Sequence, residues 1–194
     1  MLKSQISIFS HRLDGILMFL GIHGRFDRVY QSMSTQPQPG KKAPDFDLPV
    51  IGGEFGDGAT VSLSSLRGSK VVLYFYPKDD TPGCTIEGAQ FRDLHKEFTK
   101  AGFMVFGVSR DSVASHEKFK AKMNFPFDLL SDSDETMCRI FAVIKEKNMY
   151  GKKVMGIERS TCILGRNGEV AKEWRGVKVD GHALEVLNAA KSMS

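Results

Sequence analysis

One cysteine lies between a turn and the start of an amphipathic segment, in the stretch PKDDTPGCTIEGAQFRDL that runs from residue 77 to residue 94. Thr81 precedes a proline, which biases it towards an extended conformation, and Pro82-Gly83 predicts a turn. Cys84 then falls in the first turn of a helix, where unpaired N–H groups and the helix dipole favour a thiolate. Free cysteines are often buried structural residues. However, a position directly after a Pro-Gly turn, outside any apolar stripe, favours a reactive thiol.

The same residues carry a resemblance to a known family. The spacing Pro77-x-x-x-Thr81-x-x-Cys84 resembles the peroxiredoxin active-site motif P-x-x-x-[TS]-x-x-C. The later segments SRDSVASHEKF, LLSD, ERSTCILGRNGEV and WRGVKVDGHALEVL resemble the bacterioferritin-comigratory (Q-type) branch, from about Lys42 to Leu187. The resemblance implies a thioredoxin-like fold and a thiol-dependent peroxidase that acts on hydrogen peroxide and organic hydroperoxides.

It also implies roles for four residues. Cys84 would attack one peroxide oxygen and become a sulfenic acid. Thr81 would position the thiolate and the peroxide with its hydroxyl, and Pro77 would shield the pocket from water. Arg159 would stabilise the thiolate and the charge that develops on the leaving oxygen. No cofactor or metal is expected, since the chain has no C-x-x-C and no Cys/His cluster with zinc spacing.

The partner of this cysteine is missing from the places where the resemblance would put it. A resolving cysteine in this branch often lies five residues further on, where the chain has Ala89, and the segment KFKAKM, a second possible place, also lacks one. Cys138 lies beside Met137 on a predicted helix, and Cys162 lies in an apolar strand, so core packing is favoured for both. The sequence therefore predicts a one-cysteine cycle with thioredoxin, glutaredoxin or glutathione as the external reductant.

Two other functions compete for the same thiol. A redox-regulated holdase or peroxide sensor would use Cys84 without catalytic turnover. A dithiol oxidoreductase would need a cysteine where Thr81 stands in TPGC. Among the neighbours, Lys78, Asp79 and Asp80 are predicted to form a solvated loop face, and Glu87 is expected to lie outside the site. The three histidines of this region, at positions 95, 116 and 182, have no metal-like spacing.

The elements around these residues alternate between strands and helices. DFDLPV predicts an edge strand ended by Pro49, and TVSL a short strand. Buried strands are predicted at 70–76 and 103–109, and helices at 84–100 and 112–123. Asp132 and Glu135 form a capping-box-like start to a helix through Phe141. Asn167-Gly168 indicates a hairpin, and a last helix starts near Asp180. This order predicts an α/β fold with a central mixed sheet flanked by helices.

The first 42 residues differ from the rest. The apolar run GILMFLGI, residues 15–22, is far shorter than the roughly 18 residues a membrane span needs. Residues 1–42 are therefore expected to be an extension and flexible linker, a mis-assigned start or a presequence, and residues 43–194 the domain. The formal charge of +4 is dispersed, which argues against a nucleic-acid interface. Three cysteines without a close pair suggest reduced thiols in the cytoplasm, or in an organelle if the extension targets one. A monomer or weak dimer is expected.

Overall fold

The structure is a computed structural model that describes residues 37–52, 55, 58–149 and 151–193. They belong to one compact unit, residues 35–194. Of the predicted extension and linker, residues 1–42, the part up to residue 36 lies outside the described residues. The end of the predicted flexible linker pairs with the domain instead: Gly40 donates a hydrogen bond to the Val170 carbonyl at 2.8 Å, and Lys42 forms a bridge with Glu169. In the part of the chain that the structure describes, no helix is long and apolar enough to cross a membrane.

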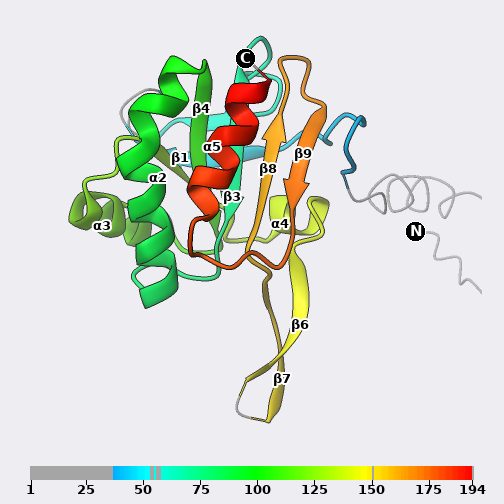
Figure 1. The fold of residues 1–194 in the computed structure, drawn as a ribbon. Coiled ribbons are helices and arrows are strands. Elements are labelled where there is room, and N and C mark those ends of the chain that lie inside the picture. Colours follow the sequence, from blue (N-terminus) through cyan, green and yellow to red (C-terminus); the bar gives the residue numbers. More distant parts are fainter. Residues whose placement is uncertain (1–36, 53–54, 56–57, 150, 194) are drawn as a thin grey trace, which may run out of the picture. The chain divides into compact units, whose positions relative to one another are not determined.

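A mixed sheet forms the centre of this unit (Figure 1). Across the described residues its strand order is β2-β1-β5-β4-β3-β8-β9. The strands are β1 (Asp47–Ile51), β2 (Thr60–Ser62), β3 (Lys70–Phe75), β4 (Phe103–Ser109), β5 (Asp128–Ser131), β8 (Ser160–Leu164) and β9 (Val170–Trp174). The strands β3, β4 and β5 are parallel, and the other pairings are antiparallel. The predicted buried strands at β3 and β4 are confirmed.

Helices cover both faces of the sheet. One face packs against α2 (Pro82–Lys100), α3 (Val113–Met123) and α5 (His182–Ser192), through a core that includes Phe91, Phe119 and Val186. The other face packs against the short α4 (Thr136–Ile140), through a core that includes Phe75 and Phe141. This arrangement confirms the predicted fold class. The even-numbered residues of β3 point to the first core and the odd-numbered ones to the second, as alternation along a strand requires.

Two details of the predicted elements are wrong. The first strand does not end at Pro49 and is not an edge: β1 continues to Ile51 and pairs with β2 on one side and β5 on the other. On the β2 side the hydrogen bond comes from Val50, whose N–H donates to the Ala59 carbonyl, so the missing N–H of Pro49 faces β5. Pro49 is tolerated there because the pairing with β5 involves only Val50 and Ile51. The capping box is only half formed. The Asp132 carboxylate accepts the N–H groups of Met137 and Cys138 at the helix start, as a cap does. The Glu135 carboxylate binds Arg110 instead of turning back to Asp132.

A separate ribbon of two strands was not predicted. It consists of β6 (Ile144–Met149) and β7 (Lys152–Ile157), paired antiparallel, and it projects away from the central sheet (Figure 1). Its residues are mostly exposed or half-buried, so neither face produces the alternation of apolar and polar residues that identifies a strand in sequence.

Candidate active site

Cys84 lies where the parallel strand β3 ends and the chain turns into α2. Open α/β folds place their chemistry at this edge of the sheet. Thr81 is the N-cap residue of α2 and is extended, as predicted for a residue before proline. Pro82 begins the helix, which puts Cys84 in its first turn. The cysteine is only 3% exposed, so its sulfur lies in a nearly dry environment beside unpaired helix N–H groups.

Arg159 reaches this cysteine from the junction of β7 and β8. Its Nη2 atom lies 3.4 Å from Cys84 Sγ, and its Nη1 atom donates to the Glu87 carboxylate. The planar guanidinium therefore holds the sulfur with one nitrogen and a carboxylate with the other. A Cβ atom at Gly83 would lie 3.3 Å from the same Nη2 atom. The glycine before the cysteine thus leaves room for the arginine to lie against the helix start.

Glu87 belongs to the site, although the sequence placed it outside. Its side chain is completely buried, and its second carboxylate oxygen has no hydrogen-bond partner among the described residues. Burial raises the pKa of Glu87 to about 7, against the opposing effect of the Arg159 charge. The one sequence signal was its position three residues after Cys84, which puts both side chains on the same side of a helix.

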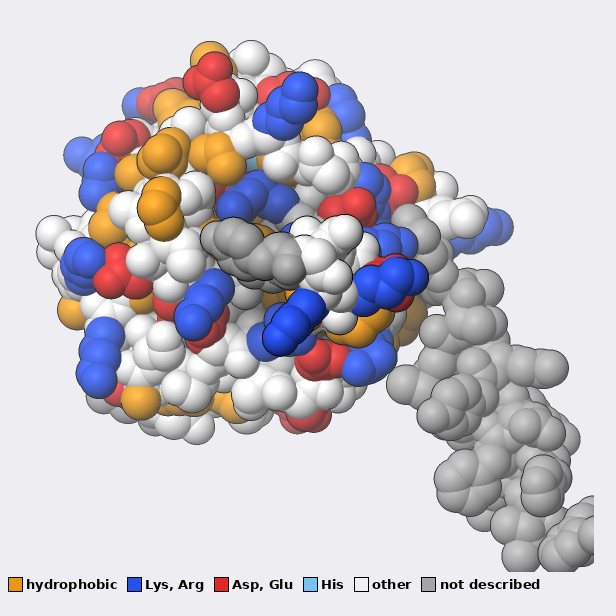
Figure 2. Space-filling model, turned by 90° about the horizontal axis from the view of Figure 1, so that it is seen from below, with side chains coloured by type: hydrophobic (Ala, Val, Ile, Leu, Met, Phe, Trp, Pro, Cys, Tyr) orange, Lys and Arg blue, Asp and Glu red, His pale blue; other side chains and the backbone are white. Residues whose placement is uncertain are grey.

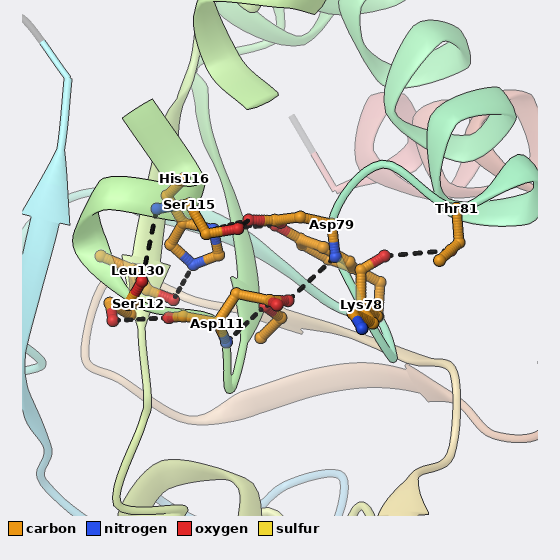
Figure 3. Close-up of polar contacts among 11 residues, drawn as sticks. Lys78, Asp79, Thr81, Asp111, Ser112, Ser115, His116 and Leu130 are labelled. Carbon is orange, nitrogen blue, oxygen red and sulfur yellow. Dashed lines mark hydrogen bonds and ion pairs between the residues drawn. The ribbon is translucent and has the colours of Figure 1, made fainter. Parts of the chain in front are cut away.

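Thr81 and Pro77 adjoin the cysteine without bonding to it. The Thr81 hydroxyl donates to the Lys78 carbonyl at 3.0 Å, a contact visible in Figure 3. Within the described part of the chain, no hydrogen bond joins Thr81 to Cys84. Pro77 is half-buried directly after Tyr76, at the end of β3. Among the four predicted site residues, the structure therefore brings Cys84 and Arg159 into direct contact, and leaves Thr81 and Pro77 on the loop before the helix.

The loop before the cysteine is fixed by a buried polar cluster, and here the prediction for Asp79 is wrong. Asp79 is buried, whereas its neighbour Asp80 is exposed and binds Lys122. The Asp79 carboxylate accepts hydrogen bonds at 2.7 Å from the hydroxyls of both Tyr76 and Ser115. These two hydrogen bonds replace the water that the Asp79 carboxylate loses on burial.

His116 completes this cluster (Figure 3). Its ring is completely buried, with Nδ1 lying 2.9 Å from the Asp79 carboxylate and Nε2 lying 3.2 Å from the Leu130 carbonyl. A carboxylate oxygen only accepts, so Nδ1 donates the hydrogen bond to Asp79. The ring links the loop before Cys84 to the end of β5 through its two nitrogens. Burial would raise the pKa of Asp79, but hydrogen bonds and charge from His116 outweigh burial and lower it.

The same loop is tied to the ends of two further strands. The Asp79 backbone N–H donates to the Asp111 carboxylate at 2.9 Å, which also accepts from Ser109 at 2.7 Å. Ser131 donates to the Asp111 carbonyl at 2.7 Å. The ends of β4 and β5 therefore hold the segment that leads into the cysteine, and this support fixes where α2 begins.

The other two cysteines lie on the far side of the sheet. Cys138 and Cys162 belong to the core beneath α4, whereas Cys84 belongs to the core beneath α2 and α5. Both are completely buried, which confirms the predicted core packing. Burial raises the pKa of Cys162 to about 12 and raises that of Cys138 further, with Asp132 adding to the effect on Cys138. Neither thiol ionises readily at neutral pH, and the sheet separates both from Cys84.

A single thiol at the start of a helix, held by an arginine in a thioredoxin-like fold, defines the class of thiol-dependent peroxidases. Comparison with known proteins agrees with this class. A model of the AhpC/TSA family matches residues 39–173. Peroxiredoxin Bcp of Xanthomonas campestris is 55% identical over 150 residues, which cover 77% of this chain and 92% of that protein. Peroxiredoxin Bcp of Bacillus subtilis is 49% identical over 156 residues, 80% of this chain and 96% of that protein.

Solved structures of similar proteins share the fold. A structure of Xanthomonas campestris Peroxiredoxin Q has a TM-score of 0.71 and 54% identity, covering 77% of this chain and 92% of that one. A structure of Xylella fastidiosa PrxQ has a TM-score of 0.75 and 43% identity, and the match covers 82% of this chain and 99% of that one. The chain belongs to the AhpC/TSA family, in its bacterioferritin-comigratory peroxiredoxin branch, and is a thiol-dependent peroxidase.

Proposed function

We propose that Cys84 reduces hydrogen peroxide and alkyl hydroperoxides in a one-cysteine cycle. The thiolate attacks one peroxide oxygen, the O–O bond breaks, and the sulfur is oxidised to a sulfenic acid. The second oxygen leaves with the bonding electrons and takes up a proton, giving water or an alcohol. The observation that carries this proposal is the contact of Arg159 with the Cys84 sulfur, 3.4 Å from Nη2.

The arginine is placed to act on the transition state. Negative charge moves from the sulfur to the leaving oxygen during the attack, and a fixed guanidinium beside both atoms stabilises that charge without reorganising. Glu87 fixes the guanidinium from its other end. Thr81 would contribute by turning its hydroxyl from the Lys78 carbonyl towards the bound peroxide, and Pro77 would exclude water from the loop side of the pocket.

The substrate class is supported by one relative. A solved structure of the Xanthomonas campestris bacterioferritin comigratory protein, 53% identical and with a TM-score of 0.71, is described together with the alkyl peroxide reduction activity of that protein. Alkyl hydroperoxides are therefore proposed as substrates of this chain alongside hydrogen peroxide.

The return of the sulfenic acid to a thiol is proposed to need an external reductant. A first thiol displaces water from the sulfenic acid and forms a mixed disulfide with Cys84. A second thiol then attacks that disulfide and releases Cys84 and an oxidised reductant. Thioredoxin, glutaredoxin or glutathione could supply both thiols. Support comes from the position of Cys138 and Cys162, which lie across the sheet from Cys84.

A comparison of three variants tests the proposal. Cys84→Ser is expected to abolish consumption of hydrogen peroxide and cumene hydroperoxide with dithiothreitol as reductant, whereas Cys138→Ser and Cys162→Ser retain most of it. Intact mass and peptide mapping after one equivalent of peroxide should find one added oxygen on Cys84 and no disulfide. Turnover by Cys84→Ser would refute the assignment of the nucleophile. Oxidation of Cys84 without turnover would favour the sensor or holdase function.

A further inference from the structure

The ribbon of β6 and β7 joins the core only at its base, through Ile157 and Ile144, and most of its other described residues are exposed. A two-stranded ribbon on its own is marginally stable in water, and burial against another surface normally supports it. Here the central sheet is complete without it, and Val154 on one face and Met155 on the other are 36% and 54% exposed. A projecting ribbon with exposed apolar side chains suggests a surface that another molecule covers.

One face of the ribbon is basic. Residues paired across an antiparallel ribbon lie on the same face. The pairs Lys145–Gly156, Lys147–Val154 and Met149–Lys152 therefore place three lysines and Val154 together. We call these four residues, Lys145, Lys147, Lys152 and Val154, the basic face. Glu146 lies on the opposite face, where it binds Lys153 at 3.0 Å, and the three lysines of the basic face have no acidic partner among the described residues.

The basic face adjoins the catalytic cysteine. The strand β7 ends at Ile157, two residues before Arg159, which contacts the Cys84 sulfur. The Lys147 side chain passes over Gly156, whose missing Cβ would lie 3.5 Å from its Cδ atom, and its Nζ atom donates to the Ile157 carbonyl at 2.5 Å. Burial, and next the charge of Arg159, lower the pKa of Lys147, while Glu158 and then Cys84 act in the opposite direction. Lys147 is thus within electrostatic reach of the active site.

The length of the ribbon indicates the size of the missing molecule. Lys152 precedes Ile157 by five residues, which in a strand spans about 16 Å. A peroxide bound at Cys84 is too small to contact both ends of the ribbon. Seen from below, Lys and Arg side chains lie around the middle of the surface at this end of the molecule, with Asp and Glu side chains between them (Figure 2). A ligand that covers both the basic face and the cysteine must therefore be a macromolecule.

We propose that the basic face is the docking surface for a protein reductant whose own thiol is bordered by acidic side chains. The inference rests on the proposed function, because the partner is required by the sulfenic acid that peroxide leaves on Cys84. Docking places the partner's thiol at this sulfur, where it displaces water and forms the mixed disulfide. A second thiol of the same partner then releases Cys84 and leaves the partner with a disulfide. The exposed Lys145 and Lys152 attract the acidic border, and Val154 supplies an apolar contact.

The test separates docking from chemistry by changing the reductant. Lys145→Glu/Lys152→Glu reverses two charges of the basic face and leaves Lys147 and the catalytic residues intact. Lys96→Glu/Lys118→Glu is the matched control, since it makes the same charge change at exposed lysines of α2 and α3. Steady-state peroxide reduction is measured for each protein with thioredoxin and with dithiothreitol, at low and high salt.

The expected result is a loss specific to the protein reductant. With thioredoxin, kcat/KM of Lys145→Glu/Lys152→Glu should fall about tenfold at low salt, mainly through KM, and the difference should shrink at high salt. With dithiothreitol, and in the control variant with either reductant, the rates should match the unaltered chain. These results would also show that the reversed charges leave the fold and the peroxide step intact.

Several results would overturn the proposal. One is an unchanged kcat/KM with thioredoxin, and another is an equal loss in the control variant. A loss restricted to a carboxylate-bearing hydroperoxide would assign the basic face to substrate, and charge-dependent binding to phosphatidylglycerol vesicles without a thioredoxin effect would assign it to a membrane surface. Turnover with dithiothreitol but not with thioredoxin would also refute it. Absence of turnover with every thiol would instead refute the proposed function itself.

Discussion

His116 and Asp79 are joined by a buried hydrogen bond beneath the loop that leads into α2. The imidazole Nδ1 lies 2.9 Å from the carboxylate, and neither side chain reaches solvent to any extent. The pair links α3 to the segment between β3 and α2, two elements that are far apart in sequence. Its role is therefore to fix the position of the residues that precede Cys84.

Removing this partner should destabilise the protein. His116→Phe keeps a ring of similar size but leaves the Asp79 carboxylate buried without the hydrogen bond from Nδ1, which costs about 1.5–3 kcal/mol of unfolding free energy. Urea denaturation measures the loss. Asp79→Asn/His116→Phe is the control, since it also removes the carboxylate charge, and it should recover part of the stability. If the losses in His116→Phe and in Asp79→Asn sum to the loss in the double variant, the two residues do not interact.

The different burial of the neighbouring residues Asp79 and Asp80 could not be predicted from the sequence. Asp79 and Asp80 have the same side chain, yet one is buried and the other binds Lys122 on the surface. The difference arises from His116, which lies 37 positions away and enters the cluster only when α3 packs on the sheet. A charged residue in a loop is usually solvated, and no local pattern indicated otherwise.

Local signals predicted the parts that depend on local structure. The position of Cys84 in the first turn of a helix and the continuous apolar strands follow from residues close together in the chain, and the structure contains both. The predicted Pro82-Gly83 turn is wrong, because these two residues are the first of α2 and the turn precedes them at residues 79–80. Glu87 was missed because its role comes from Arg159, 72 residues further on. The ribbon was missed because a strand exposed on both faces has no hydrophobic alternation.

Arg159→Lys should slow peroxide attack by more than the change in thiolate fraction explains. An ordinary thiol, with a pKa of about 8.5, is a few per cent ionised at neutral pH, so complete ionisation raises the rate only about 10- to 30-fold. Lysine keeps the charge but cannot hold Cys84 and Glu87 at once. We expect a loss of about 10²-fold in the stopped-flow rate. Thiolate absorbance gives the ionised fraction. If the rate of peroxide attack falls only in proportion to that fraction, Arg159 acts by stabilising the thiolate alone.

Gly83→Ala should weaken the same contact from the opposite side. The added Cβ would lie 3.3 Å from Arg159 Nη2, so the guanidinium must shift by a few tenths of an ångström away from the Cys84 sulfur. Gly83 does not have a positive φ, so alanine causes no backbone strain and should preserve the melting temperature. The rate of sulfenic acid formation is expected to fall severalfold. In the Arg159→Lys background the same substitution should have little effect, and an equal loss there would assign the effect to another contact.

Glu87 should make stability depend on pH between about 4.5 and 7. Burial raises its pKa from 4.5 to about 7, so the folded protein binds a proton that the unfolded chain has lost. The unfolding free energy therefore falls as the pH rises through this window, by on the order of 3 kcal/mol from this group. Glu87→Gln keeps an oxygen for Arg159 but does not titrate. Urea denaturation across the window should give a flatter profile for the variant, and identical slopes would contradict the raised pKa.

Ala89→Cys should convert the one-cysteine cycle into one with internal resolution. In α2 the five-residue separation corresponds to about 7.5 Å along the helix axis, beyond the roughly 7 Å that a disulfide allows between Cα atoms. The first turns must therefore unwind before the new thiol reaches the sulfenic acid of Cys84. One equivalent of peroxide should leave a disulfide in the variant and a sulfenic acid in the unaltered chain. Excess peroxide without reductant should drive only the unaltered chain to sulfinic acid. Peptide mapping distinguishes these products, and a bridge from Cys84 to Cys138 or Cys162 in the unaltered chain would overturn the one-cysteine cycle.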